Sequence, residues 1–220
     1  MNALNFEQAR FNMIEQQVRP WDVLDDRVLR ALAEVPREKF VPERYQSLAF
    51  SDISIPLDHG QAMMPPKIEG RLLQALAIKP GDRVLEVGTG SGYLTACLAH
   101  LGGQVHSVDI FESFVQEAEP KLAPAYAGKF TLETRDAAAG WDQPGVFEAI
   151  AVTGSLPVLH RGFHEALALG GRLFVVVGKP PVMQALLVTR TGGSTWDQES
   201  LFETSLPALV NAAQPDGFRF

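Results

Sequence analysis

The sequence predicts an α/β fold, doubly wound around a mostly parallel sheet, with an N-terminal helical cap. The first observation is a short apolar strand starting at Arg83 that runs into a glycine-rich turn and then into a helical pattern. The second is that strand and helix patterns alternate from about Ile68 to Val177, which implies parallel strands with right-handed crossovers. The third is an acid, Asp109 or Asp136, at the end of each of the next two candidate strands. Together these features are typical of a doubly wound nucleotide- or nucleoside-binding fold.

The N-terminal region is expected to be helical and irregular. An amphipathic helix is expected at Asn5–Val18, ended by Arg19-Pro20 because proline lacks a backbone donor. A second helix is expected at Asp26–Ala33, with the side chain of Asp25 as its cap. We therefore divide the chain into a cap, residues 1–60, and an α/β domain, residues 61–220, that form one compact unit.

The α/β region is expected to alternate helices with apolar strands. The expected helices are Ile68–Ala77, a helix after the glycine turn, Phe111–Leu122, and His160–Leu169 ended by Gly170-Gly171. The expected strands after the central one are Val105–Val108, Phe130–Thr134, Phe147–Val152, Arg172–Val177 and a late pair, Val182–Thr189 and Glu199–Thr204.

The glycine turn identifies the kind of ligand. The stretch Arg83–Tyr93 reads R-V-L-E-V-G-T-G-S-G-Y, with glycines at alternate positions. A dinucleotide-binding turn would carry its third glycine where this chain has Tyr93. The spacing E-x-G-x-G-x-G instead resembles the first motif of class I S-adenosylmethionine-dependent methyltransferases. A tight turn that binds no ligand is the alternative.

Acids at successive strand ends support a ligand. Asp109 lies where a carboxylate can accept hydrogen bonds from ribose hydroxyls. The methyltransferase interpretation expects Asp136 near the adenine amine. Either acid could instead cap the helix that follows it. With Glu86 before the glycines, three acids in register are harder to explain by capping alone.

Composition excludes several classes of protein. The net charge of −7 and the pI of about 5.2 disfavour a general nucleic-acid binder. No apolar stretch has the roughly 18 residues that a membrane span requires. Met1–Arg10 does not read as a signal peptide, and the single cysteine, Cys97, falls on an apolar helix face where core packing is expected. We expect a cytoplasmic protein without a metal site.

Several segments together resemble the protein-L-isoaspartate O-methyltransferases, over most of the chain. They are V-P-R-E-K-F-V-P at 35–42, I-P-L-x-x-G-Q at 55–61, the run from Lys79 to Tyr93, F-E-A-I-A-V-T-G-S at 147–155, Gly170–Leu173, and L-P-A-L-V at 206–210. The resemblance implies a Rossmann-like class I fold with a seven-stranded sheet whose seventh strand is antiparallel. It implies S-adenosyl-L-methionine as methyl donor, S-adenosyl-L-homocysteine as product, and an isoaspartyl peptide or protein as acceptor.

The resemblance also implies site residues. Donor-binding residues are expected at the turn and at the strand ends: Glu86, Gly88, Thr89, Gly90, Ser91, Gly92, Asp109, Ile110, Asp136, Ala137 and Thr153. Acceptor-binding residues are expected in two segments facing each other, Ala62–Lys67 and Thr153–Leu156, and comprise Gln61, Ala62, Lys67, Gly154 and Ser155.

The acceptor loop departs from the family pattern. Where the family carries T-I-S-Q-P, this chain has A-M-M-P-P, so Met64 occupies the position of an acceptor-contacting serine. A carboxylate acceptor, with a pKa near ~4, needs no general base. A hydroxyl acceptor would need one, and His59 is the nearest candidate, with a simple turn histidine as the alternative. Lys67 and Arg71 are the nearest cations for an anionic acceptor.

Three hypotheses follow. The leading one is a carboxyl methyltransferase of the isoaspartyl-repair type, or a close relative acting on another, unidentified small acceptor. The second is a non-catalytic protein that binds the donor or a partner, and the third is a nicotinamide-dependent oxidoreductase. The sequence leaves the true acceptor and the oligomeric state open.

Overall fold

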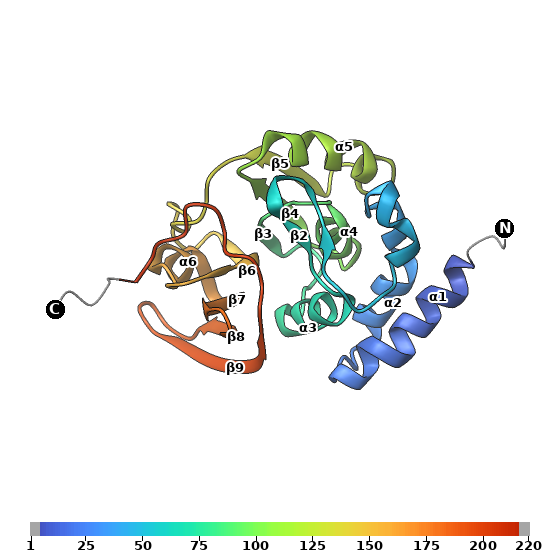
Figure 1. Ribbon diagram of the computed structural model, residues 1–220. Helices are drawn as coiled ribbons and strands as arrows, with labels where there is room; N and C mark the ends of the chain where they lie inside the picture. Colours follow the sequence, from blue (N-terminus) through green and yellow to red (C-terminus); the bar gives the residue numbers. More distant parts are fainter. Residues whose placement is uncertain (1–4, 216–220) are drawn as a thin grey trace.

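The computed structural model of the protein describes residues 5–215, and its centre is a seven-stranded sheet (Figure 1). In chain order the strands are β3 (Arg83–Val87), β4 (Gln104–Asp109), β5 (Phe130–Thr134), β6 (Phe147–Leu156), β7 (Leu167–Lys179), β8 (Val182–Arg190) and β9 (Trp196–Thr204). Their spatial order is β5-β4-β3-β6-β7-β8-β9. The neighbours from β5 to β7 are parallel, whereas β8 is antiparallel to both β7 and β9. The predicted α/β fold with a mostly parallel sheet is confirmed.

The strand order creates a crevice in the middle of the sheet. From β3 the chain moves outward to β4 and β5, and then returns to place β6 on the other side of β3. The connections after β3 and after β6 therefore leave in opposite directions. In open α/β sheets such a switch point opens a ligand crevice at the carboxyl ends of the strands.

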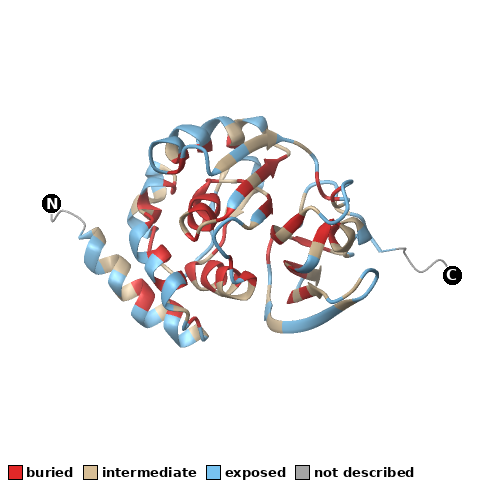
Figure 2. Ribbon diagram, turned by 180° about the vertical axis from the view of Figure 1, so that it is seen from behind, coloured by how far each residue is buried: buried red, intermediate tan, exposed pale blue. Residues whose placement is uncertain are grey.

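Helices cover both faces of the sheet. They are α1 (Phe6–Met13), α2 (Asp26–Glu34), α3 (Pro66–Leu76), α4 (Tyr93–His100), α5 (Glu112–Tyr126) and α6 (Arg161–Ala166). Successive residues of β3 point to opposite faces: Val84 packs in the core shared with α1 to α5, and Leu85 in the core shared with α6. Figure 2 shows the buried central strands between these layers. The central strands thus carry buried apolar residues on both faces, as expected for parallel strands.

The N-terminal helical path runs further than the sequence predicts. Beyond α1 it continues through a π-helical turn at Ile14–Val18 and a 3-10 turn at Arg19–Trp21, so Pro20 does not end it. It ends at Asp22, whose φ of 58° is left-handed. Asp25 caps α2 as predicted, since its side chain accepts a hydrogen bond from the backbone of Arg27.

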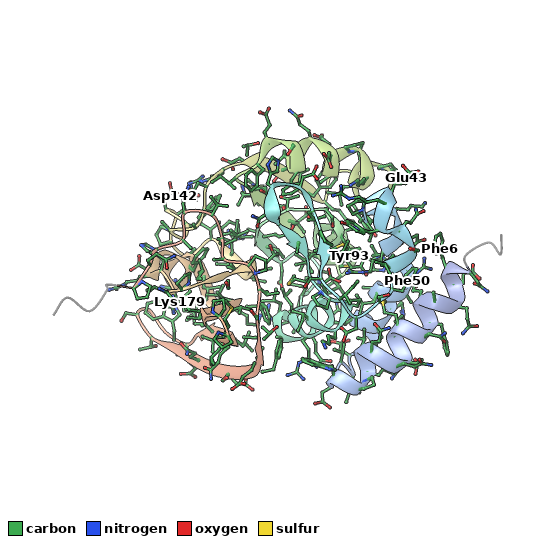
Figure 3. All side chains as sticks on the ribbon, viewed as in Figure 1. Phe6, Glu43, Phe50, Tyr93, Asp142 and Lys179 are labelled. Atoms are coloured by element: carbon green, nitrogen blue, oxygen red, sulfur yellow. The ribbon has the colours of Figure 1, made fainter. Side chains whose placement is uncertain are left out.

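This region packs onto the same core as the sheet. The rings of Phe6 and Phe50 lie side by side, 6.0 Å apart between centroids (Figure 3). Two short strands, β1 (Ile55–Pro56) and β2 (Ala62–Met63), then form a hairpin that leads into α3. Pro66 starts α3, where its missing N–H costs nothing.

Several predicted boundaries were wrong. Helix α5 runs to Tyr126 and not to Leu122, β7 extends on both sides of Arg172–Val177, and β9 starts at Trp196 and not at Glu199. Two further boundaries were set by strand pairing. The helix predicted at His160–Leu169 ends at Ala166, because Leu167 pairs with Phe147 and begins β7. The strand predicted to end at Val152 continues to Leu156, with a register shift after Ala151. In both cases pairing with a neighbouring strand decided the boundary, and local sequence carries no signal for such pairing.

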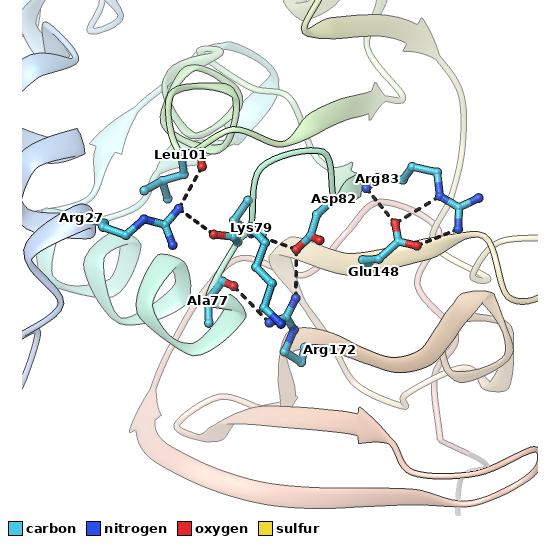
Figure 4. A network of polar contacts seen from close by, with 9 residues as sticks. Arg27, Ala77, Lys79, Asp82, Arg83, Leu101, Glu148 and Arg172 are labelled. Atoms are coloured by element: carbon cyan, nitrogen blue, oxygen red, sulfur yellow. Dashed lines mark hydrogen bonds and ion pairs between the residues drawn. The ribbon is translucent and has the colours of Figure 1, made fainter.

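A polar network fixes the amino-terminal edge of the sheet (Figure 4). Arg27 of α2 donates to backbone carbonyls just beyond the ends of α3 and α4, at 2.8 and 3.0 Å. Arg172 of β7 contacts Asp82 at 3.1 Å, and Arg83 forms a two-pronged pair with Glu148. These contacts close the edge opposite to the glycine turn.

Within residues 5–215, no helix combines the length and the apolar character needed to cross a membrane.

Candidate active site

The glycine turn after β3 lies directly against the carboxyl end of β6. Gly88 has a φ of 101°, and a Cβ there would lie 2.2 Å from Oγ1 of Thr153. That hydroxyl donates to the carbonyls of Val87 and Gly88, at 3.0 and 2.9 Å. Only glycine fits this position, because any side chain would strain the backbone and displace Thr153. The turn therefore presents bare backbone at the switch point.

An open cavity lies over the turn, and we call it the Asp109 cavity; its space of about 640 Å³ includes the solvent at its mouth. It gathers predicted site residues from β2, the glycine turn, β4, the segment after β5, and β6. Those lining it are Gln61, Ala62, Gly88, Gly90, Asp109, Ile110, Asp136, Ala137, Thr153 and Gly154. Donor and acceptor residues predicted from separate segments thus share one space at the carboxyl ends of the strands.

Asp109 is held rigidly at the mouth of the glycine turn. Its Oδ2 accepts from the backbone N–H of Gly90 at 2.9 Å, and its Oδ1 from that of Phe111 at 3.0 Å. Burial raises the pKa of this carboxyl, while the backbone N–H bonds and the nearby His59 lower it. The carboxylate both orders the turn and lines the cavity, so it can accept from ligand hydroxyls.

Replacing Asp109 with Ala should weaken the binding of S-adenosyl-L-homocysteine by about 1–3 kcal/mol, because a charged acceptor is lost. Calorimetric titration of the wild type and the variant measures this. Asp58→Ala is a matched control, because Asp58 lies exposed in the neighbouring hairpin loop and outside this cavity. Unchanged affinity in Asp109→Ala would refute the ribose assignment.

Asp136 is already partnered within the chain. Its Oδ1 accepts from the backbone of Ala138 at 3.0 Å, and its Oδ2 from the side chain of Asn211 at 2.7 Å. Asn211 belongs to a segment after β9, residues 205–212, which we call the C-terminal strap.

Ser155, predicted as an acceptor-binding residue, anchors this strap. Its N–H and Oγ donate to the carbonyls of Pro207 and Leu206, at 2.8 and 2.9 Å. Ser155 is fully buried and lines neither cavity, so its role is to position the strap.

A second, smaller cavity adjoins the first, and we call it the Glu86 cavity; its space of about 330 Å³ includes solvent at its opening. Predicted residues that line it are Ala62, Met64, Glu86, Gly88, Thr89, Gly90, Ser91 and Thr153. Glu86 is fully buried. One of its carboxyl oxygens accepts from the hydroxyl of Thr95, while Oε1 has no partner among residues 5–215. Burial raises the pKa of Glu86 to about 8, although the hydrogen bond from Thr95 lowers it.

Glu69 lines the same cavity and was missed from the sequence. It forms a buried ion pair with Arg37, whose guanidinium also donates to the carbonyls of Ala49 and Met64 at 2.8 and 2.7 Å. Burial raises the pKa of Glu69 to about 7, against the lowering effect of Arg37. The sequence held a signal: Glu69 is followed at helical spacing by Leu72, so it falls on the apolar face of α3.

His59 lies at the rim and lines neither cavity. Its ring stacks on Phe111 with centroids 4.1 Å apart, and its Nε2 is 2.8 Å from Oγ of Ser113. The loop that carries it, between β1 and β2, also supplies Leu57 and Gln61 to the Asp109 cavity. The geometry is that of a latch holding this loop against the start of α5.

Replacing His59 with Ala should speed dissociation of S-adenosyl-L-homocysteine several-fold, because the contact that holds the loop is lost. It should leave kcat almost unchanged, because His59 transfers no proton in this arrangement. Stopped-flow dissociation and steady-state rates measure the two effects. His164→Ala is the control, because His164 packs on Trp196 and lines neither cavity. A fall in kcat of about a hundredfold, the size expected for a general base, would contradict the latch.

Three other predicted residues lie outside both cavities. Lys67 pairs with Asp52 at 2.7 Å and stands over the Trp21 ring, which draws its ammonium away from the site. Arg71 donates to the carbonyl of Trp21 at 3.1 Å and likewise faces away. Gly92 packs against Ala118 of α5, where a Cβ would be 3.0 Å from the alanine Cβ.

The remaining lining of the Asp109 cavity is mostly apolar and was not predicted. These residues are Leu57, Val87, Val108, Phe111, Phe114, Arg135, Ala138, Pro207, Leu209 and Val210. Half of them are chain neighbours of predicted positions, and that neighbourhood was the available signal. The strap residues come from a distant segment, and only folding brings them here.

The arrangement fits a nucleoside with a polar tail. Bare backbone at Gly88 and Gly90, Asp109 at a strand end, and the unpartnered oxygen of Glu86 offer hydrogen-bonding groups to such a ligand. On this sheet topology, these are the features of a class I S-adenosylmethionine-dependent methyltransferase.

Comparison with known proteins specifies the family. The family model of protein-L-isoaspartate(D-aspartate) O-methyltransferase (PCMT) matches residues 8–210. The chain is 37% identical to protein-L-isoaspartate O-methyltransferase 1 of Rhodopseudomonas palustris (strain HaA2) over 95% of this chain and 86% of that one. It is 38% identical to the Gloeobacter violaceus protein-L-isoaspartate O-methyltransferase over 86% and 92%. The chain belongs to this family.

The fold is shared with solved members. A Plasmodium falciparum structure described as a protein-L-isoaspartate O-methyltransferase, in complex with S-adenosyl-L-homocysteine, superposes with a TM-score of 0.79 at 21% identity. The superposition covers 94% of this chain and 99% of that one. At this identity the likeness speaks for the fold alone, and it agrees with the sheet order described above.

Proposed function

We propose that this protein transfers the methyl group of S-adenosyl-L-methionine to the carboxylate of isoaspartyl residues in peptides and damaged proteins. The observation that carries the proposal is the Asp109 cavity, where Asp109 and the glycine turn lie beside Ala62 and Gly154. Family membership supports the acceptor class. A small carboxylate acceptor of another kind would fit the same cavity.

The donor supplies an electrophilic methyl group, and the chain's residues bind and orient. Asp109 is placed to accept from ribose hydroxyls, and Asp136 and Ala137 to contact the adenine. The Gly88 turn and Glu86 are placed to hold the amino-acid end. The carboxylate acceptor is already ionised at neutral pH, so no base is needed. Orientation in a site screened from water can then supply much of the acceleration, up to roughly 7–11 kcal/mol.

The cap and the strap close the site from opposite sides of the crevice. Leu57 and Gln61 of the loop between β1 and β2 line the Asp109 cavity together with Pro207 and Leu209 of the strap. We infer that residues 1–60 act as a cap on the domain of residues 61–220 and not as a separate unit. A cytoplasmic location fits a chain whose cysteine, Cys97, is buried and reduced. The net charge of −7 is unfavourable for nucleic-acid binding.

A second candidate function is donor binding without methyl transfer. It is favoured because the polar groups on the acceptor side are already engaged within the chain or are missing. The Thr153 hydroxyl is committed to two backbone carbonyls, and the amide of Gln61 donates to the carbonyl of His59 at 3.2 Å. Ala62 and Met64 offer no side-chain donor. Acceptor affinity would then be weak while donor affinity stays intact.

Two measurements decide between these functions. Calorimetric titration with S-adenosyl-L-homocysteine tests donor binding, and transfer of labelled methyl groups to an isoaspartyl peptide, with the aspartyl isomer as control, tests the reaction. We expect donor binding and slow, isomer-selective transfer. Binding without transfer would favour the second function, and no binding would refute both.

A further inference from the structure

The Glu86 cavity holds two carboxylates that come from different elements. Glu86 projects from β3 and Glu69 from α3, and the side chains are 0% and 2% exposed. Among residues 5–215, Arg37 is the cation that pairs with either of them, and it pairs with Glu69. With both carboxyls ionised, the three side chains carry one uncompensated negative charge. A buried charge without a counter-charge is costly, so the cavity favours a cationic group.

An unpartnered oxygen of Glu86 indicates where the cationic group would bind. Oε1 of Glu86 is buried and, within the described residues, accepts no hydrogen bond. Buried polar atoms are almost always partnered in native proteins, so this oxygen calls for a donor from the cavity. The raised pKa values of Glu86 and Glu69, about 8 and about 7, have burial as their main cause and agree with a missing positive charge.

The two cavities form a continuous path for one elongated ligand. They share residues that line both, namely Leu57, Ala62, Gly88, Gly90 and Thr153. With the nucleoside placed at Asp109, the amino-acid end of the ligand extends into the Glu86 cavity. That end carries an ammonium group with three N–H donors, more than one carboxylate can accept with good geometry.

We propose that Glu69 is a second anchoring residue for the α-ammonium group of the methyl donor, acting beside Glu86. The inference rests on the proposed function, because it uses the placement of the nucleoside at Asp109. Arg37 then has two tasks: it keeps Glu69 oriented, and it fixes the carbonyl of Met64 at 2.7 Å. If Glu69 were purely structural, it would only neutralise Arg37. An anchoring Glu69 differs from a structural one because its replacement weakens the binding of ligands with an amino group selectively.

The surrounding groups do not replace the ammonium. Arg37 stacks on the Tyr93 ring, 4.7 Å from its centroid, and its Nε and Nη2 donate to the carbonyls of Ala49 and Met64. Burial raises the pKa of the Tyr93 hydroxyl and that of the Cys97 thiol, so both groups are neutral. Asp109 adds a further negative charge near Glu86. The net field at the cavity therefore favours a cation.

The test compares three ligands on the full chain by calorimetric titration. They are S-adenosyl-L-homocysteine, its analogue without the α-amino group, and its analogue without the α-carboxylate. Glu69→Gln should lower affinity about tenfold or more for the two ligands that carry the amino group, as expected for losing a charged hydrogen bond. It should leave the affinity for the analogue without the amino group almost unchanged. The glutamine amide oxygen can still accept from Arg37, which preserves the fold.

Each other outcome overturns the inference. An equal loss for all three ligands would give Glu69 a structural role, and a loss confined to ligands with the carboxylate would assign it to the opposite end of the amino acid. No loss at all would remove it from the site. Absence of S-adenosyl-L-homocysteine binding in the wild type would instead refute the proposed function, and the inference with it.

A second variant covers the case in which Glu69→Gln does not fold. Glu69→Asp keeps the charge but shortens the side chain, so it should again weaken binding only of the ligands with an amino group. Glu86→Gln provides the matched comparison across the cavity. Because both carboxylates act on one ammonium, their effects in the double variant should not add. Additive effects would show that the two residues do not share the group.

Discussion

The free energy of unfolding of the donor-free protein should fall by on the order of 3 kcal/mol between pH 5 and pH 8 through the titration of Glu86. The pKa of this carboxyl is about 8 in the folded protein because it is fully buried, against a model value of 4.5. Between those values the folded state binds more protons than the unfolded state. Stability therefore falls as pH rises through this window, and Glu69, with a pKa of about 7, adds to the fall.

Chemical denaturation of the wild type and Glu86→Gln across this pH range measures the effect. The two proteins should be similar in stability near pH 5, and the variant should be the more stable one at pH 8. Glu148→Gln is the control with the opposite sign, because its hydrogen bond and ion pair with Arg83 lower the pKa of Glu148. Its stabilisation is present above the unfolded pKa and lost in acid. Parallel curves for wild type and Glu86→Gln would contradict the assignment.

The paired changes Ala62→Thr and Met64→Ser should raise the rate of methyl transfer to an isoaspartyl peptide by about ten- to a hundredfold. Each restores a hydroxyl at a position where the family carries one, and each such hydrogen bond to a carboxylate contributes about 1–3 kcal/mol. In the structure Ala62 lines both cavities, and Met64 lines the Glu86 cavity with a 5% exposed side chain. Lys67 does not substitute for them, because it is paired with Asp52.

Steady-state assays with the isoaspartyl peptide and its aspartyl isomer measure this gain. Met63→Ser is the matched control: Met63 is equally buried and lines the same cavity, but the family has no hydroxyl there. Adding Pro65→Gln to the paired changes tests whether the next position contributes. Wild-type turnover as fast as that of a hydroxyl-bearing relative, assayed alongside, would show that the two hydroxyls matter little.

Some features of this protein follow from short-range chemistry and can be predicted from the order of the residues. The Gly88 turn needs glycine because its φ is 101°, and the alternating glycines predicted it. Asp25 caps α2 through a bond to the backbone two residues away. Alternation of apolar strands and helices predicted the parallel sheet. In each case the deciding partners lie within a few residues, so the sequence pattern is sufficient.

Tertiary structure decided which polar side chains face the site. From the sequence, Lys67 could bind an anionic acceptor or form an ion pair elsewhere. In the fold it pairs with Asp52 and lies over the Trp21 ring, so it does not face the site. Glu69 finds Arg37 across 32 residues, and Ser155 holds the strap across 51. A charged or polar side chain has many competing partners at similar energy. The choice among them depends on packing between segments distant in sequence, which no local pattern encodes.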